Sequence, residues 1–205
     1  MAIILYGIPI STYVRTARLL LSAAEVQYEL KDISIFNGEN QTDDYLSKHP
    51  FGKIPTLEIE GEILYEVDAM TYFVNEKFAK GKFAPDDLWQ RSRMYQIISI
   101  VNSYLYSPAV STIVIENLVK EQTDQTAVEN AIPPAKTALE ALEDLCHSGP
   151  YLLGSELTIA DFYLIPIFFY VSKTPQFDSI NANTPKLKAW WENARSLDLV
   201  KEICG

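Results

Sequence analysis

The order of the first three predicted elements constrains the fold most strongly. Residues 2–6 form a short apolar run that ends at Gly7 and Pro9, as a buried strand does before a turn. Apolar side chains then recur at helical spacing over residues 12–24, and residues 26–33 predict a second strand. Strand, helix and strand in a compact domain imply a right-handed crossover, so the two strands are predicted to pair in parallel.

The next segment predicts a hairpin between two helices. Residues 37–40 have loop chemistry, and residues 42–48 predict a short helix that begins at Thr42 and ends before His49-Pro50-Phe51-Gly52. Apolar and polar residues alternate on both sides of a Gly-Glu turn over residues 56–65, which predicts an antiparallel hairpin. Residues 66–78 are helical again.

Residues 81–85 read as a linker because Gly and Pro bracket them, and the chain beyond has only helical periodicity. Pro108 is predicted to bend or end the first long helix, while Pro133-Pro134 either kinks the next one or starts another. Thr158 and Asp161 predict a reciprocal cap, followed by a helix over residues 162–170 that is apolar on every side and therefore buried.

Charge and composition exclude several function classes. The 205 residues carry 17 Lys and Arg against 27 Asp and Glu, a net charge of -10, and no basic stripe that could track phosphates. Neither nucleic acid nor an acidic membrane surface is therefore an expected partner. The apolar start lacks the basic region of a signal peptide, which predicts a cytoplasmic protein. Cys146, Cys204, His49 and His147 form no metal or redox motif, so no metal is expected.

Three groups of motifs together resemble the glutathione transferases. In the first 80 residues these are Tyr6-Gly7-Ile8-Pro9-Ile10-Ser11-Thr12 with Arg15, Asn37-Gly38-Glu39, and His49-Pro50-Phe51-Gly52-Lys53-Ile54-Pro55-Thr56-Leu57, which resemble the plant-type phi class most closely. Further along, Tyr106-Ser107-Pro108 with Glu116, Tyr151-Leu152-Leu153-Gly154 and Thr158-Ile159-Ala160-Asp161 are similar to family landmarks. The resemblance implies a thioredoxin-like, glutathione-binding α/β domain over residues 1–80. It also implies an all-helical bundle over residues 86–205 that forms the hydrophobic-substrate side of the cleft.

The implied activity is a detoxifying conjugation in which the thiolate of glutathione, the co-substrate, attacks a hydrophobic electrophile. A free thiol has a pKa near ~8.5, so such an enzyme must stabilise the anion. Ser11 opens the first helix, where a hydroxyl and the helix dipole both favour an anion, and Thr12 is the neighbouring alternative. The alternative is that Ser11 acts only as a helix N-cap, and the surrounding motif favours the functional role. Neither cysteine lies in the first domain, which argues against thiol-disulfide exchange.

The resemblance also implies the contacts of the tripeptide. Pro55 corresponds to the family's cis-proline, which turns the backbone of Ile54 toward the ligand. Lys53 is either a cationic contact to a glutathione carboxylate or a solvated lysine. Glu66 and Val67 stand at the predicted start of a helix, where the family binds the γ-glutamyl end.

Two departures from the family pattern weaken this site. Val67 replaces a serine, which removes a hydroxyl bond, and Asp68 beside it either repels the ligand or binds its amino group. Asn40 and Gln41 replace a basic pair, so the glycyl carboxylate is expected to receive neutral hydrogen bonds.

In the second domain, Tyr104 and Tyr106 are candidates for the wall of the hydrophobic-substrate site, or are core residues. The resemblance implies a homodimer. Two other functions stay open: a non-catalytic binding or regulatory protein, which the departures at the glutathione site would explain, and a glutathione-dependent peroxidase or isomerase.

Overall fold

A computed structural model describes residues 2–205 of the chain, which divide into two compact units. The first reaches to Lys82 and also includes Glu202–Gly205, and the second spans Phe83–Lys201. The last residues of the chain therefore group with its beginning, an arrangement that the one-dimensional order does not suggest.

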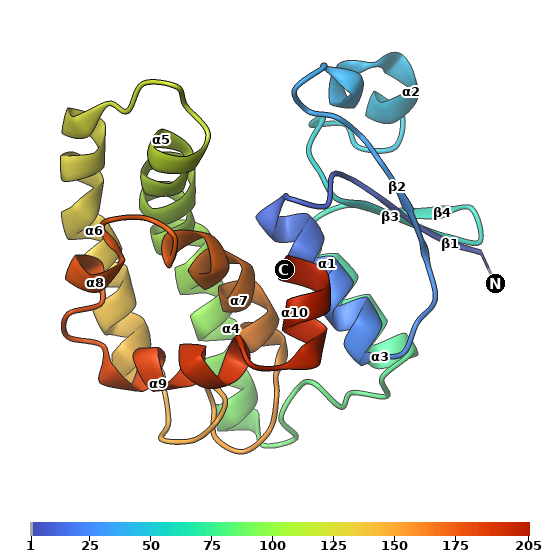
Figure 1. Cartoon of the computed structure of the whole chain (residues 1–205). Coiled ribbons are helices and arrows are strands. Elements are labelled where there is room, and N and C mark those ends of the chain that lie inside the picture. The colour runs from blue at the N-terminus through green and yellow to red at the C-terminus, as the bar shows by residue number, and fades with distance from the viewer. Residues whose placement is uncertain (1) are drawn as a thin grey trace. The chain divides into compact units, whose positions relative to one another are not determined.

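The first unit has a four-stranded sheet in the order β2-β1-β3-β4 (Figure 1). Its strands are β1 (Ile3–Tyr6), β2 (Glu29–Lys31), β3 (Thr56–Ile59) and β4 (Glu62–Leu64), and its helices are α1 (Thr12–Ala23), η1 (Glu39–Gln41), α2 (Asp43–Leu46) and α3 (Val67–Lys77). Strands β1 and β2 are parallel, and β3 pairs antiparallel with both β1 and β4. The predicted crossover and the predicted hairpin are both confirmed.

Strand β2 is much shorter than the predicted strand over residues 26–33. It is an edge strand whose partner is β1, and the paired residues run from Ile4↔Glu29 to Tyr6↔Lys31. Because β1 is itself only four residues long and ends at Tyr6, residues 32 and 33 have no strand backbone to pair with. The end of the partner, rather than the residue pattern of β2, sets where β2 ends.

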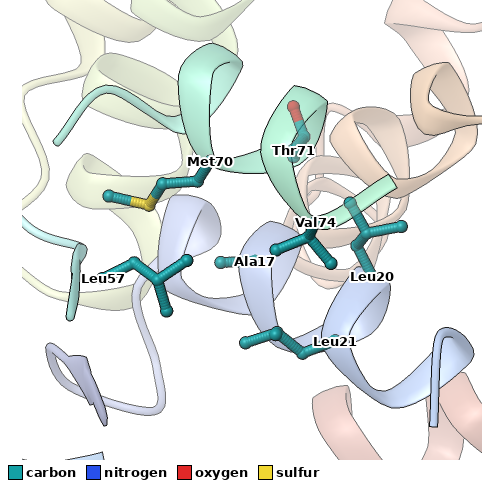
Figure 2. A pocket seen from close by; sticks show the side chains of 7 residues that line it. All are labelled: Ala17, Leu20, Leu21, Leu57, Met70, Thr71 and Val74. Atoms are coloured by element: carbon teal, nitrogen blue, oxygen red, sulfur yellow. The ribbon is translucent and has the colours of Figure 1, made fainter. Parts of the chain in front are cut away.

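Helices α1 and α3 cover one face of the sheet, and the side chains between them form the core of the first unit (Figures 1 and 2). Leu57 of β3 is completely buried beneath the two helices. The facing residues are Ala17, Leu20 and Leu21 of α1 with Met70, Thr71 and Val74 of α3. Burial of this apolar stripe explains why the 3.6-residue period of residues 12–24 folds as a helix on the sheet.

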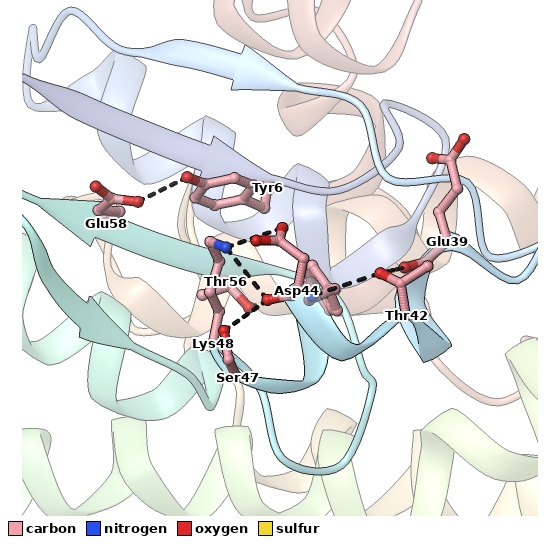
Figure 3. Close-up of polar contacts among 9 residues, drawn as sticks. Tyr6, Glu39, Thr42, Asp44, Ser47, Lys48, Thr56 and Glu58 are labelled. Atoms are coloured by element: carbon pink, nitrogen blue, oxygen red, sulfur yellow. Dashed lines mark hydrogen bonds and ion pairs between the residues drawn. The ribbon is translucent and has the colours of Figure 1, made fainter.

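The opposite face of the sheet carries α2 and a polar cluster around Tyr6 (Figure 3). Tyr6 Oη donates a 2.6 Å hydrogen bond to Glu58 Oε2, and the Nζ atoms of Lys31 and Lys48 lie 5.4 Å and 5.9 Å from the centre of its ring. Lys48 also pairs with Asp44 at 3.0 Å. Burial and the neighbouring Glu58 carboxylate raise the pKa of Tyr6 to about 12.

The second unit is helical throughout its regular structure among the described residues. Its elements are α4 (Leu88–Ile100), two π-helical segments η2 (Val101–Leu105) and η3 (Ser107–Val114), α5 (Ile115–Leu118), α6 (Gln125–Leu145), α7 (Ile159–Val171), α8 (Phe177–Ile180), α9 (Pro185–Ala194) and α10 (Asp198–Cys204), the last of which crosses into the first unit. The chain bends by 42° between Leu105 and Ser107, so the bend predicted at Pro108 is confirmed. Pro133 and Pro134 lie inside α6, and they do not start a helix of their own.

Helix α7 is the centre of the second unit. Thr158 and Asp161 form the predicted capping box at its start, and most of its residues are buried. Within residues 2–205, no single helix is long and apolar enough to cross a membrane; the bent pair Leu88–Leu105 and Ser107–Leu118 meets the length and composition criteria only when its two parts are taken together.

Candidate glutathione site

Ser11 lies between β1 and α1, directly before the first residue of α1. Gly7 ends the strand with a φ of 151°, and a Cβ atom at this position would overlap the side chain of Val14, so only glycine lets the strand approach the helix this closely. The Ser11 backbone is extended, with φ -68° and ψ 134°, and its Oγ accepts from the Val14 N–H at 3.5 Å. The local sequence thus makes Ser11 the N-cap of α1.

The cap and the proposed donor role are compatible in one residue. Capping uses a lone pair of the hydroxyl oxygen, which leaves the O–H of Ser11 to donate elsewhere. Ser11 is half-buried, whereas Thr12 is only 5% exposed. No acidic residue occupies the first turn of α1, so the positive end of the helix dipole is not neutralised there. Of the two hydroxyls, Ser11 is the one that a ligand can reach.

The segment from Lys53 to Pro55 is held by α2. The Ile54–Pro55 peptide bond is cis, as the family resemblance implies. Tyr45 Oη donates a 2.7 Å hydrogen bond to the Lys53 carbonyl and lies 2.9 Å from Thr56 Oγ1. Because Tyr45 is only 1% exposed, it fastens this turn from inside the unit, while the Lys53 side chain is exposed.

Asn40 and Gln41 both direct their amide groups at the same turn. Asn40 Nδ2 donates to the Gly52 carbonyl at 2.7 Å, and Gln41 Nε2 does so at 3.4 Å. Gly52 has a φ of 57°, and a Cβ atom there would lie 2.8 Å from the Asn40 carbonyl oxygen and would overlap the Gln41 amide. Each side chain has a second N–H, so both can still donate to a ligand after bracing the turn.

Glu66 precedes α3 in an unusual backbone conformation. Its φ of 68° with ψ 118° is rare for a residue with a side chain, and such conformations concentrate at functional sites. The side chain of Glu66 makes no capping bond, so the first N–H groups of α3 have no side-chain cap. Val67 is half-buried and Asp68 is exposed in the first turn. The start of α3 therefore has backbone N–H groups without a side-chain cap, and the Val67 side chain offers no hydroxyl there.

Comparison with known proteins identifies the family. The N-terminal domain model of glutathione S-transferases matches residues 1–76, and the C-terminal domain model of the same family matches residues 99–198. The crystal structure of glutathione transferase F7 from Populus trichocarpa is 30% identical, covers 98% of this chain and 97% of that chain, and superposes with a TM-score of 0.86. The chain belongs to the glutathione S-transferase family.

Other relatives agree with this assignment. Glutathione S-transferase F13 of Arabidopsis thaliana is 29% identical over 199 residues, which is 94% of this chain and 90% of the relative. Glutathione S-transferase 1 of Triticum aestivum is 26% identical over 212 residues, covering 97% and 92%. The predicted resemblance to plant phi-class transferases, the two-part transferase fold and membership of a transferase enzyme family are all confirmed.

In this glutathione S-transferase, the two aromatic candidates of the second unit differ in exposure. Tyr104 lies in the π-helical segment η2 and is 66% exposed, whereas Tyr106 is half-buried. Tyr104 is therefore not a core residue, which was the alternative that its helical spacing left open. Among residues 2–205, no three His, Cys, Asp or Glu side chains are grouped so that they could hold a metal ion.

Two buried side chains beside the transferase's candidate site, Tyr45 and His49, are not predicted from the sequence. The local pattern assigns Tyr45 no role beyond the predicted helix over residues 42–48, and His49 enters only as the first residue of the His49–Leu57 motif and as a histidine without a metal motif. Tyr45 lies in α2 and His49 lies just beyond its end, four residues later, which is the spacing that places two side chains on one face of a helical turn. Their rings are in fact stacked, with centroids 6.4 Å apart and an interplanar angle of 18°.

Proposed function

We propose that this chain is a glutathione transferase in which the Ser11 hydroxyl stabilises the thiolate of glutathione for attack on a hydrophobic electrophile. The observation that carries the proposal is the position of Ser11: it is accessible, it caps α1 through its oxygen, and its O–H remains a donor at the positive end of a 12-residue helix. Lowering a thiol pKa by about two units requires about 2.7 kcal/mol of preferential stabilisation. One hydrogen bond to a charged acceptor supplies about 1.5–3 kcal/mol, which is the right size.

The rest of the tripeptide is assigned to the braced turn and to the start of α3. We propose that the backbone of Ile54, next to Pro55, pairs with the extended peptide, and that Lys53 contacts a carboxylate. The free N–H groups of Asn40 and Gln41 would serve the glycyl carboxylate. Support for this comes from their placement around the Gly52 carbonyl, which fixes both amides beside the same turn.

We assign the γ-glutamyl end to Glu66 and Val67. The uncapped start of α3 supplies backbone N–H groups for a carboxylate, and the Glu66 side chain is free of a capping bond and can accept from the amino group. The rare backbone conformation of Glu66 supports a ligand role, because the fold maintains it without a capping benefit. The missing hydroxyl at Val67 is expected to weaken affinity about tenfold to a hundredfold.

For the second substrate we propose an apolar electrophile that contacts Tyr104 and Tyr106. The exposure of Tyr104 supports this, since an exposed aromatic ring is available to pack against an apolar ligand.

We also propose that the enzyme is a homodimer. Leu88 and Trp89 at the start of α4 are each 76% exposed, which favours a partner surface for them, and sedimentation equilibrium showing a stable monomer would remove this part of the proposal.

The deciding experiment compares wild type with Ser11→Ala. We expect the variant to bind glutathione with similar affinity but to lose the thiolate absorbance of the bound ligand at neutral pH, and to lose about 10- to 100-fold in turnover of a generic aryl halide. Asp124→Ala is the matched control, because it removes the N-cap of α6 and lies outside the proposed glutathione site and partner surface. Equal thiolate absorbance in wild type and Ser11→Ala would reduce Ser11 to a helix cap.

A binding or regulatory protein is the second candidate, and the neutral residues Asn40, Gln41 and Val67 favour it. Its expected signature is retention on immobilised glutathione without turnover of any substrate, together with no effect of Ser11→Ala. Turnover that depends on Ser11 excludes it.

A further inference from the structure

The imidazole of His49 is enclosed by three aromatic rings of the first unit. Its ring centroid lies 6.4 Å from that of Tyr45, 5.1 Å from that of Tyr65 and 6.2 Å from that of Phe51. The rings of Phe51 and Tyr65 also contact each other edge-on at 6.3 Å. His49 itself is only 2% exposed, so its ring is a buried element of packing rather than a surface group.

This cage joins the two segments to which we assigned the ends of glutathione. On one side, Tyr45 holds the Lys53 carbonyl through its hydroxyl. On the other side, Tyr65 directly precedes Glu66 and Val67 at the start of α3. The His49 ring is the contact shared by both, so a change at His49 is transmitted to both ends of the ligand.

Within the described part of the chain, one nitrogen of the His49 ring lacks the hydrogen bond that a buried polar atom usually makes. Nδ1 of His49 is buried and has no hydrogen-bond partner among residues 2–205. A neutral imidazole tolerates one idle acceptor, but an imidazolium carries N–H donors on both nitrogens and a charge. Protonation therefore places a charge and a second N–H donor among aromatic rings, which is unfavourable.

The rings of Tyr45 and Tyr65 contact His49, and the charges of Lys53 and Glu66 act on it. Tyr45 comes from α2, Lys53 follows the turn, and Tyr65 and Glu66 lie between β4 and α3. Burial is the main cause that lowers the pKa of His49, and the Lys53 charge acts in the same direction, while the Glu66 carboxylate and a backbone hydrogen bond raise it. Of these four groups, only Glu66 is an anion that can accept from an imidazolium.

We propose that His49 is a positioning residue for glutathione: its neutral ring keeps the Lys53–Pro55 and Glu66–Val67 segments in their binding arrangement, and its protonation draws the Glu66 carboxylate away from the amino group of the ligand. The inference rests on the proposed function, since it assigns a pH response to the same site. The imidazolium and the ligand's ammonium group compete for one carboxylate. Proton uptake at His49 and glutathione binding are therefore mutually unfavourable.

Calorimetric titration of S-methylglutathione, which has the same peptide but no thiol, into wild type and His49→Phe tests this. Phenylalanine fills an aromatic cage but cannot take up a proton. We expect the wild-type affinity to fall about fivefold or more between about pH 7.5 and about pH 5.5, while His49→Phe stays constant within about twofold. The carboxyl groups of this ligand titrate below the interval and its sulfur is a thioether with no proton to lose, whereas the thiol of glutathione, stabilised by Ser11, would itself titrate within the interval. His147→Phe removes the other histidine of the chain and is expected to keep the wild-type profile.

A second measurement does not depend on the folding of a variant. The chain has two histidines, so proton NMR of the wild type follows both imidazoles through a pH titration. Saturating S-methylglutathione is expected to lower the pKa of His49 by an amount that matches the loss of affinity for this ligand, because linkage is reciprocal. An unchanged or raised value, or the same pH profile in wild type and His49→Phe, overturns the inference. Failure of wild type to bind glutathione at any pH would instead refute the proposed function.

Discussion

The indole N–H of Trp190 on α9 donates a 2.8 Å hydrogen bond to Oδ1 of Asp161 in the first turn of α7. The same oxygen accepts from the Leu152 N–H at 2.9 Å, and Oδ2 accepts from the N–H and the hydroxyl of Thr158 at 2.8 Å each. Asp161 is completely buried, and burial raises the pKa of its carboxyl group while these donors oppose the rise. One carboxylate thus ties the 151–154 turn, the start of α7 and helix α9 together.

Asp161→Asn is expected to destabilise the protein by about 2–4 kcal/mol, because the amide presents an NH₂ group to neighbours that are all donors. Urea unfolding followed by tryptophan fluorescence measures the change. Asp198→Asn is the control, since the Asp198 side chain is fully exposed and pairs only with Lys201. Similar losses of unfolding free energy in the two variants would show that the hydrogen bonds of Asp161 stabilise the protein no more than an exposed ion pair does.

Gly52→Ala tests the turn braced by Asn40 and Gln41. The φ of 57° and the overlap with both residues act together, so we expect a loss of about 2 kcal/mol or more and weaker glutathione binding. Gly61→Ala is matched: Gly61 has a φ of 90°, but a Cβ atom there meets no atom within 4 Å, and a loss of only about 1 kcal/mol is expected. Chemical denaturation measures the loss of stability, and calorimetry measures the change in glutathione affinity. An equal loss at both positions would mean that crowding at Gly52 is unimportant.

Val67→Ser restores a hydroxyl at the start of α3. If the γ-glutamyl carboxylate binds there, we expect glutathione affinity to rise about tenfold, since the new hydrogen bond has a charged acceptor. Calorimetry compares this variant with Val119→Ser, a change at a 53% exposed position of the second unit that is expected to leave affinity unaltered. No gain at position 67 would place the carboxylate elsewhere.

The raised pKa of Tyr6 predicts that the folded protein loses stability at alkaline pH. Its pKa is raised from 10.0 to about 12 in the folded protein, so the folded state disfavours the phenolate. The contribution of Tyr6 is complete below the unfolded value of 10.0 and is lost as the pH rises toward about 12. Denaturant unfolding between about pH 9 and about pH 12 should show a steeper decline for wild type than for Tyr6→Phe. Tyr104→Phe, at a 66% exposed position, should follow wild type.

Local sequence patterns predict much of the fold and part of the candidate site. The 3.6-residue period of residues 12–24, the alternation around Gly61 and the Thr158–Asp161 pair each concern residues a few positions apart, and each predicted element forms. Ser11 as the cap of α1 is of this kind, because the bond spans only three residues. The Ile54–Pro55 turn was likewise readable from its motif.

Other features were decided only when distant segments met. The end of β2 follows from the end of β1, the amides of Asn40 and Gln41 are oriented by the Gly52 carbonyl, and Asp161 bonds to Trp190, 29 residues further along the chain. The cage around His49 likewise combines rings from α2, the turn after it and the end of β4. Backbone propensity and capping act over one or two turns, and the sequence by itself therefore determined the elements of this transferase and its serine cap. Side-chain partners depend on which surfaces the packed sheet and helices bring together, and the tertiary structure alone decided them.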